Sequence, residues 1–216
     1  MDEMKIIVSS FYYPNYKDLA DKTIYQNLKH YCEKNGYEFL PFALESMPEG
    51  TPYEIACQAC RLNTQLILKT LEDRQDFDWF FHRDCDSIIT DMDFKLDSII
   101  ALYPNAEIIT GSDIAGISMG QVLVKNTYRV KKYLAMVLAG IDSGSYEHEQ
   151  KFMWANPVEF LKETPQRMMN SYDCEARLEN DVAPSSWQEG DFLVHMAGLN
   201  LEQKMSRLDY WMGKVR

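Results

Sequence analysis

Asp84 and Asp86 are the residues of the sequence best suited to chemistry, because a single residue separates them just after the apolar run DWFF. Residues i and i+2 of an extended segment point to the same side, which would bring the two carboxylates close together. Two such carboxylates repel each other unless a cation lies between them. Oxygen ligands of this kind suit Mn²⁺ or Mg²⁺, which also coordinate phosphate oxygens. The pair predicts a divalent-metal site at a strand end; the alternative is a solvated turn in which both acids face water.

His195 is a second candidate metal ligand, near the end of the alternating apolar segment at residues 191–198. A neutral imidazole could complete a metal shell with the two aspartates. The small residues Ala197 and Gly198 would let the backbone approach a ligand closely. A core histidine with its hydrogen bonds satisfied is the alternative, and both interpretations remain open from the residues alone.

Three further residues could contact a nucleotide-sugar. Ser112 and Asp113 end an expected strand, and ligands of open α/β sheets bind beyond the carboxyl ends of strands, so both could contact a sugar hydroxyl. A glycine-rich loop without a ligand is the equal alternative. Arg61, on an expected helix near the paired aspartates, could neutralise a diphosphate with two hydrogen bonds, although a surface arginine is the more usual case.

The scaffold that positions these residues is predicted to be a single α/β domain over residues 1–216, which could form the N-terminal part of a longer protein. Short apolar runs alternate with helical periods along the chain. We expect strands at residues 5–12, 37–44, 106–113, 120–126 and 191–198, and another beginning at residue 78. We expect helices at residues 19–32, 53–71, 128–139, 147–161 and 201–211. Residues 164–189 are the least regular part and are expected to form a long surface excursion.

Composition argues against several classes of function. The net charge of −11 disfavours nucleic acid as the main partner, because binding phosphates along a backbone needs clustered lysine and arginine. The first residues, MDEMK, lack the basic start of a secretory signal, and the longest apolar run, at residues 133–141, is too short to cross a bilayer. We therefore expect a soluble cytoplasmic protein without a membrane segment and with free thiols among its five cysteines.

Four motifs in order resemble the galactosyl- and xylosyltransferase family that includes yeast mannan and plant xyloglucan enzymes. They are the aromatic strand with DCD, the stretch SDIAGISMGQVLVKNT, the pair PQR and NSY, and GDFLVHMAG. The match covers most of the chain from about residue 61 to residue 200. The resemblance implies an α/β GT-A fold: a Rossmann-like, nucleotide-sugar-binding fold whose central mixed, mainly parallel sheet is flanked by helices.

The resemblance also implies roles for individual residues. The metal ligands would be Asp84, Asp86 and His195. The residues toward the nucleotide and the donor sugar would be Ser9, Arg61, Asp84, Ser112, Asp113, Gly198 and Lys204. Gln150 would lie near the anomeric carbon, with Asp113 as the other catalytic residue. Asn200 stands where the family often has a lysine, so phosphate neutralisation would fall to Lys204 or Arg61.

These features predict a Mn²⁺-dependent glycosyltransferase, with Mg²⁺ as an alternative ion. It would move a hexose from a UDP-sugar donor to a glycan or glycoprotein acceptor, with retention at the anomeric carbon. A metal-dependent nucleotidyltransferase or phosphohydrolase is one alternative, although it would usually need further carboxylates for a two-metal site. A non-catalytic glycan-binding module is another, and exposed aromatics such as Trp154, Trp187 and Trp211 would serve it.

Overall fold

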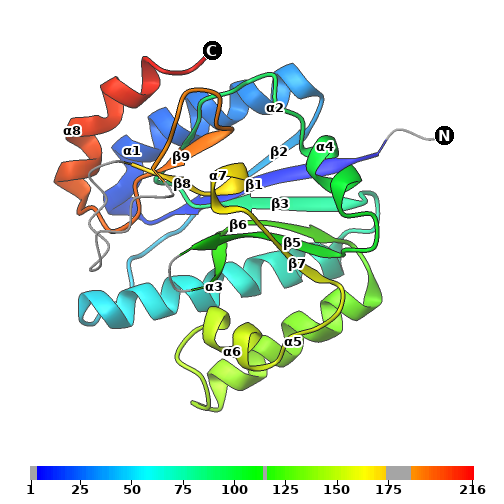
Figure 1. Cartoon of the computed structure of the whole chain (residues 1–216). Helices are drawn as coiled ribbons and strands as arrows, with labels where there is room; N and C mark the ends of the chain where they lie inside the picture. Colours follow the sequence, from blue (N-terminus) through cyan, green and yellow to red (C-terminus); the bar gives the residue numbers. More distant parts are fainter. Residues whose placement is uncertain (1–3, 114–115, 174–185) are drawn as a thin grey trace.

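A sheet of six strands lies between two layers of helices in the computed structural model, which describes residues 4–113, 116–173 and 186–216 (Figure 1). The strand order is β2-β1-β3-β6-β5-β7. The strands are β1 (Ile6–Tyr12), β2 (Glu38–Ala43), β3 (Trp79–Arg83), β5 (Ile108–Asp113), β6 (Gly116–Lys125) and β7 (Leu161–Thr164). Only β6 runs against the other five, so the sheet is mixed and mainly parallel. The predicted fold class is confirmed.

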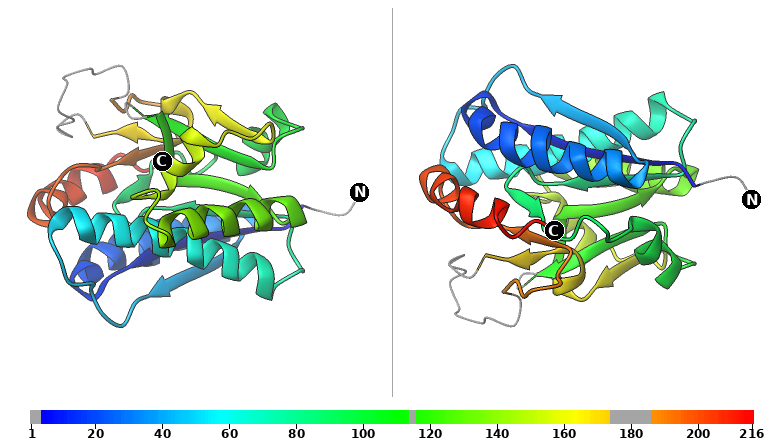
Figure 2. Two further views of the ribbon diagram at one scale, coloured as in Figure 1. Left: turned by 90° about the horizontal axis from the view of Figure 1, so that it is seen from below. Right: turned by 90° about the horizontal axis from the view of Figure 1, so that it is seen from above.

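The central strands are apolar on both faces because helices cover both faces. Alternate residues of β1 show this: Ile6 and Val8 join one buried cluster, whereas Ile7 joins the other. One face packs against α3 (Pro52–Asp73), α5 (Tyr128–Asp142) and α6 (Glu149–Ala155). The other face packs against α1 (Lys17–Lys22), a π-helical segment (Thr23–Leu28), α2 (Lys29–Asn35) and α4 (Leu96–Leu102). The two views in Figure 2 show these layers from below and from above.

A second, three-stranded sheet stands beside the carboxyl end of β3. Its order is β4-β9-β8, and its strands are β4 (Ser87–Ile89), β8 (Ser171–Tyr172) and β9 (Leu193–His195). Antiparallel pairing of β4 with β9 places Ser87 opposite His195. A third apolar cluster packs this sheet against α8 (Leu201–Met212), through Ile88, Val194 and Trp211. The small sheet therefore places β9, which comes late in the sequence, beside the residues that follow β3.

The structure corrects three expectations about the elements. The helix expected at residues 19–32 contains the π-helical segment. The helix expected at residues 147–161 ends at Ala155, and the chain then enters edge strand β7. The expected surface excursion is wrong for residues 166–173, which form α7 (Gln166–Met169) and β8 with several buried side chains; residues 174–185 lie outside the described part. Pairing with β9 buries β8, and a strand of two residues is too short to produce a periodic pattern.

Every helix in the described ranges is too short or too polar to span a bilayer.

Candidate active site

Asp84 and Asp86 belong to a tight turn between β3 and β4. The amide of Ser87 donates to the carbonyl oxygen of Asp84 at 3.1 Å, and the Ser87 hydroxyl donates to the same oxygen at 2.7 Å. The two carboxylates differ in their surroundings: the side chain of Asp84 is 37% exposed, whereas that of Asp86 is 12% exposed. The turn thus presents one half-exposed and one buried carboxylate.

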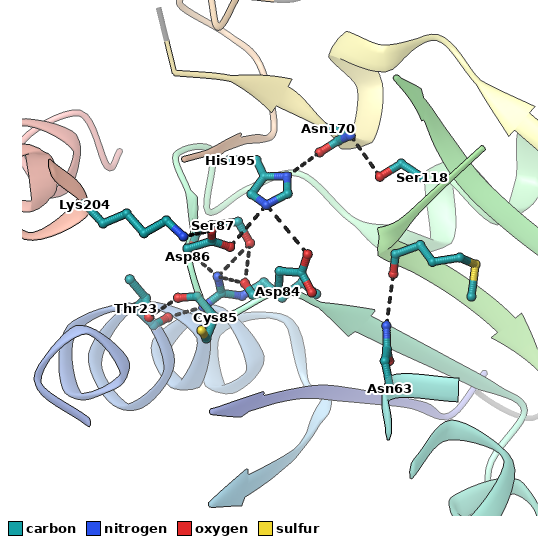
Figure 3. Close-up of polar contacts among 12 residues, drawn as sticks. Thr23, Asn63, Asp84, Cys85, Asp86, Ser87, Ser118, Asn170, His195 and Lys204 are labelled. Carbon is teal, nitrogen blue, oxygen red and sulfur yellow. Dashed lines mark hydrogen bonds and ion pairs between the residues drawn. The ribbon is translucent and has the colours of Figure 1, made fainter. Parts of the chain in front are cut away.

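His195 completes a group of three ligand-type side chains (Figure 3). Its Nε2 lies 3.1 Å from Oδ1 of Asp86 and 3.6 Å from Oδ2 of Asp84. One ligand atom from each of the three residues lies within 4.8 Å of the others. Two carboxylate oxygens and one imidazole nitrogen form a donor set that suits Mn²⁺. The residues present therefore fit the metal that the sequence predicts.

Asn170 fixes the orientation of the His195 ring. The Oδ1 atom of Asn170 lies 2.8 Å from Nδ1 of His195, and the Asn170 amide donates to Oγ of Ser118 at 3.1 Å. An amide oxygen only accepts, so Nδ1 carries a proton, and Nε2 is the nitrogen that faces the carboxylates; it donates to Asp86 when protonated and can bind a metal when it is not. A Cβ at Gly111 would lie 2.9 Å from Cβ of Asn170, so the glycine allows this close approach. The NSY motif was the only sequence signal for Asn170, and sequence reasoning gave it no role.

Lys204 forms an ion pair with the buried carboxylate, with Nζ 2.8 Å from Oδ2 of Asp86. Burial opposes ionisation of Asp86, but the charges of Lys204 and His195 outweigh it and hold the pKa of Asp86 well below its usual range. Burial also works against protonation of His195, yet the negative charges of Asp86 and Asp84 prevail, and the pKa of His195 is raised. The site is therefore a compact network of opposite charges.

Gly120, on β6, leaves the space that the Asp84 carboxylate occupies. A Cβ at this position would lie 2.4 Å from Oδ2 of Asp84, and the Gly120 carbonyl accepts the Asp84 amide at 2.7 Å. We expect Gly120→Ala to turn the carboxylate away and to weaken Mn²⁺ binding by roughly 10- to 100-fold, as loss of a ligand's support usually does. Calorimetric titration with Mn²⁺ measures this.

Gly213→Ala is the matched control, because Gly213 has an ordinary helical φ of −71° and a Cβ added there would come no closer than 3.4 Å to other atoms. Equal Mn²⁺ affinity in Gly120→Ala and Gly213→Ala would contradict the steric argument.

A cavity of about 410 Å³ opens beside the three ligand-type side chains. We refer to it as the central cavity. Its aromatic lining residues include Phe11, Tyr12, Tyr13 and Tyr16. Its remaining wall includes Ala59, Cys60 and Asn63 of α3, Gly120 of β6, and Glu149 and Gln150 of α6. Asp84, Asp86, His195 and Lys204 also line it, so four of the residues predicted for metal and phosphate binding share one cavity with Gln150.

The other predicted site residues lie elsewhere or contact other partners. Ser9 is buried in β1, and its hydroxyl has no hydrogen-bond partner among the described residues. Arg61 binds Asp142, with Nε 2.6 Å from Oδ1. Ser112 donates to the carbonyl oxygen of Thr164 at 3.1 Å. None of these three belongs to the described lining of the central cavity.

The last two predicted site residues are Asp113 and Gly198. Asp113 ends β5, but its side chain lies outside the described part. Gly198 is exposed, adopts a φ of +74°, and follows the cavity residue Ala197 directly. A positive φ is readily available only to glycine, so Gly198 sets the course of the chain next to the cavity.

Glu149 lines the central cavity, and the sequence did not predict that it would be buried. It is 1% exposed, and its Oε2 has no hydrogen-bond partner among the described residues. Burial raises the pKa of its carboxyl group to about 7. Asn63 is also buried, and it donates to the carbonyl oxygen of Met119 at 3.2 Å while its own Oδ1 has no such partner. The motif EHEQ resembles an exposed helix start, so the sequence carried no signal for this burial.

Comparison with known proteins gives matches among solved structures, whereas no family model and no curated protein matches the chain. The similar structures include several glycosyltransferases, and the fold of this chain is that of the GT-A glycosyltransferases. The narrower galactosyl- and xylosyltransferase family stays a prediction.

Three of these structures illustrate the similarity. A glycosyltransferase involved in the glycosylation of the major capsid of PBCV-1 is 16% identical, with a TM-score of 0.72 over 95% of this chain and 99% of that one. The bifunctional glycosyltransferase WbbM in its apo form is 11% identical, with a TM-score of 0.65 over 99% of this chain and 50% of that one. The galactosyltransferase LgtC, in complex with donor and acceptor sugar analogues, is 12% identical, with a TM-score of 0.54 over 97% of this chain and 100% of that one.

Proposed function

We propose that this chain is a Mn²⁺-dependent glycosyltransferase that moves a hexose from a UDP-sugar to a glycan or glycoprotein acceptor, with retention of anomeric configuration. One observation carries the proposal: in a GT-A fold, Asp84, Asp86 and His195 converge on the wall of the central cavity. Retention and the UDP-sugar rest on the family resemblance. The named similar proteins are glycosyltransferases, and one of them was solved with donor and acceptor sugar analogues.

The metal would be held by Asp84, Asp86 and His195. When bound, such an ion acts as a Lewis acid that stabilises the negative charge developing on the departing diphosphate. Asn170 accepts a hydrogen bond from Nδ1 of His195 and so keeps Nε2 aimed at the two carboxylates, where it can bind a metal once it has lost its proton. Side chains held in this way need little reorganisation when a ligand binds, which favours tight coordination.

Lys204 is the residue that would neutralise the phosphates. It is the only lysine or arginine in the described lining of the central cavity. Its ammonium group lies beside Asp86, so a diphosphate bound at the metal would come within its reach. Arg61 was the other candidate, but its hydrogen bonds to Asp142 and Gln65 occupy its guanidinium outside the cavity lining.

Different lining residues of the central cavity would contact the base and the sugar. Phe11, Tyr12, Tyr13 and Tyr16 offer aromatic surfaces for a nucleobase. Toward α6, Glu149 and Gln150 offer carboxyl and amide groups for the hydroxyls of the donor sugar. Because its pKa is about 7, Glu149 can donate a hydrogen bond when protonated and accept one when ionised.

Thermal denaturation with a nucleotide panel tests the donor assignment. With Mn²⁺ present, we expect UDP at about 100 times its dissociation constant to stabilise the fold by about 2.7 kcal/mol, or roughly 5–10 °C for a chain of this size. GDP and CMP should protect less. Equal protection by all three nucleotides would remove the basis for a UDP-sugar donor.

Product analysis separates this function from its alternatives. A glycosyltransferase incubated with its donor and Mn²⁺ releases UDP together with free or transferred sugar. Release of pyrophosphate or inorganic phosphate would indicate a nucleotidyltransferase or phosphohydrolase instead. Binding of a glycan without metal or nucleotide, and with no product formed, would indicate a non-catalytic module.

A further inference from the structure

Arg83 is a buried cation without a carboxylate partner among the described residues. Its side chain is fully buried where β3 ends, directly before Asp84. Its guanidinium donates to backbone carbonyl oxygens, those of Thr23, Asp84 and Ser87, and to the Ser87 hydroxyl at 3.0 Å. Burying a charged group is costly unless hydrogen bonds satisfy it, so this arrangement needs a structural or functional reason.

The π-helical segment contacts the turn through Thr23 and the strand that follows the turn, β4, through Asn27. Oγ1 of Thr23 donates to the carbonyl oxygen of Cys85 at 2.6 Å. Asn27, four residues later and so on the same helix face, donates to the carbonyl oxygen of Ile89 at 2.8 Å and accepts the Ile89 amide at 2.8 Å. Both residues are buried. Single π-helical turns occur frequently at functional sites, and this one lies against the backbone that carries the paired aspartates.

The contacts divide the turn into two sides. Figure 3 shows Thr23 and Cys85 below the turn and His195 above it. On the helix side, the turn is bonded through its backbone carbonyl oxygens, those of Asp84 and Cys85. The two carboxylates instead contact His195 and Lys204, which line the central cavity, and Oδ1 of Asp84 also lies 3.6 Å from Nε2 of His82 on β3. A turn held by its carbonyls leaves its side chains free to face the ligand.

We propose that Arg83, Thr23 and Asn27 are positioning residues, a turn clamp that fixes the backbone of Asp84–Cys85–Asp86 so that both carboxylates face the central cavity. Holding the turn before the ligand arrives removes much of the ordering cost of binding. The effect on sugar transfer rests on the proposed function, but the effect on metal binding and on the free protein does not.

Thr23→Val is the central test, because it removes the hydroxyl and nearly keeps the side-chain shape. We expect Mn²⁺ affinity, measured by titration without any nucleotide, to fall about tenfold, the lower end of the effect of losing a ligand's supporting contact. Thr23→Ser keeps the hydroxyl and should restore most of the affinity. In the metal-free protein, the Ser87 amide, which donates to Asp84, should exchange its hydrogen faster in Thr23→Val than in the wild type.

Thr70→Val is the matched control for lost stability. Thr70 is also buried in a helix, and its hydroxyl donates to the carbonyl oxygen of Leu66 at 2.8 Å, as Thr23 does to Leu19 at 3.0 Å. Its recorded hydroxyl bond stays within α3, away from the turn. The Thr70→Val variant should have a lower melting temperature but unchanged Mn²⁺ affinity and unchanged hydrogen exchange at the Ser87 amide.

The outcomes decide the proposal in each case. If Thr23→Val behaves like Thr70→Val in Mn²⁺ titration and in Ser87 exchange, the contacts are merely structural and the clamp is overturned. If the wild type binds Mn²⁺ but transfers no sugar, the proposed function fails. The clamp is still supported in that case if Thr23→Val binds Mn²⁺ about tenfold more weakly than the wild type. If the wild type binds no Mn²⁺, Ser87 exchange alone decides. Arg83→Lys, which keeps the charge but loses the forked geometry, should weaken Mn²⁺ binding in the same direction.

Discussion

Asp84→Ala will reduce sugar transfer by about a thousandfold or more, because a catalytic metal contributes several kcal/mol to the transition state and each 1.36 kcal/mol is tenfold in rate. The same variant will keep a melting temperature close to that of the wild type. The Asp84 side chain is half-exposed, and in the described part it forms no ion pair with lysine or arginine. Steady-state rates with a UDP-sugar and thermal melting of the metal-free protein measure the two effects.

Asp86→Ala gives the contrasting result, since it loses both activity and stability. The buried Asp86 carboxylate is the partner of Lys204, whose side chain is 10% exposed. Removing one member of a buried ion pair typically costs about 3–5 kcal/mol, which lowers the melting temperature by roughly 10 °C in a protein of this size. The double variant Asp86→Ala/Lys204→Met should recover much of that stability without recovering Mn²⁺ binding.

If Asp84→Ala retained full activity in excess EDTA, the metal assignment would be wrong.

His195→Ala will lower Mn²⁺ affinity and flatten its dependence on pH. A proton and the metal compete for Nε2, and the pKa of His195 is raised by the neighbouring carboxylates. In the wild type, Mn²⁺ affinity should therefore weaken as pH falls through this raised pKa, beginning above the ordinary value of about 6.5. Titrating Mn²⁺ into wild type and variant at pH 6 and pH 8 measures the difference.

The metal-free protein should show the opposite dependence on pH. A folded-state pKa above the unfolded value of about 6.5 adds stability that is fully present below that value and is lost as pH rises through the folded pKa. This contribution makes the metal-free wild type more stable at pH 6 than at pH 8, and His195→Ala lacks it. If the variant lost melting temperature but kept wild-type Mn²⁺ affinity, His195 would be a structural residue and not a ligand.

Sequence reasoning succeeded where the signal was local and periodic. The runs that became β1, β3 and β5 are apolar over several residues, and the paired aspartates follow one of them at a spacing that suits metal binding. The segment around His195 marked it as a candidate ligand but left a core histidine open, and the resemblance favoured the ligand role, because no local pattern could connect it to a turn 109 residues earlier. Pairing of β4 with β9 makes that connection, and such pairing depends on tertiary structure.

The missed residues share a physical cause: their roles depend on burial that the local pattern contradicts. Glu149 lies in a charged segment at a helix start, which is normally exposed, yet α6 packs against β6 and buries it. Asn170 follows an irregular stretch and gains its role only through His195. The π-helical segment has an ordinary helical pattern, and its contacts are with Cys85 and Ile89, each 62 residues away in sequence from its partner.

The two sheets also determine when, during synthesis of the chain, the metal site becomes complete. The last strand of the six-stranded sheet, β7, ends at Thr164, whereas His195 belongs to β9 of the small sheet. Contacts between residues far apart in sequence close long loops and tend to form late in folding. A nascent chain can therefore assemble its six-stranded sheet before its metal site is complete. It can bind the ion with all three ligands only after β9 has paired with β4. Until then, a partly made chain would carry the paired aspartates without the imidazole.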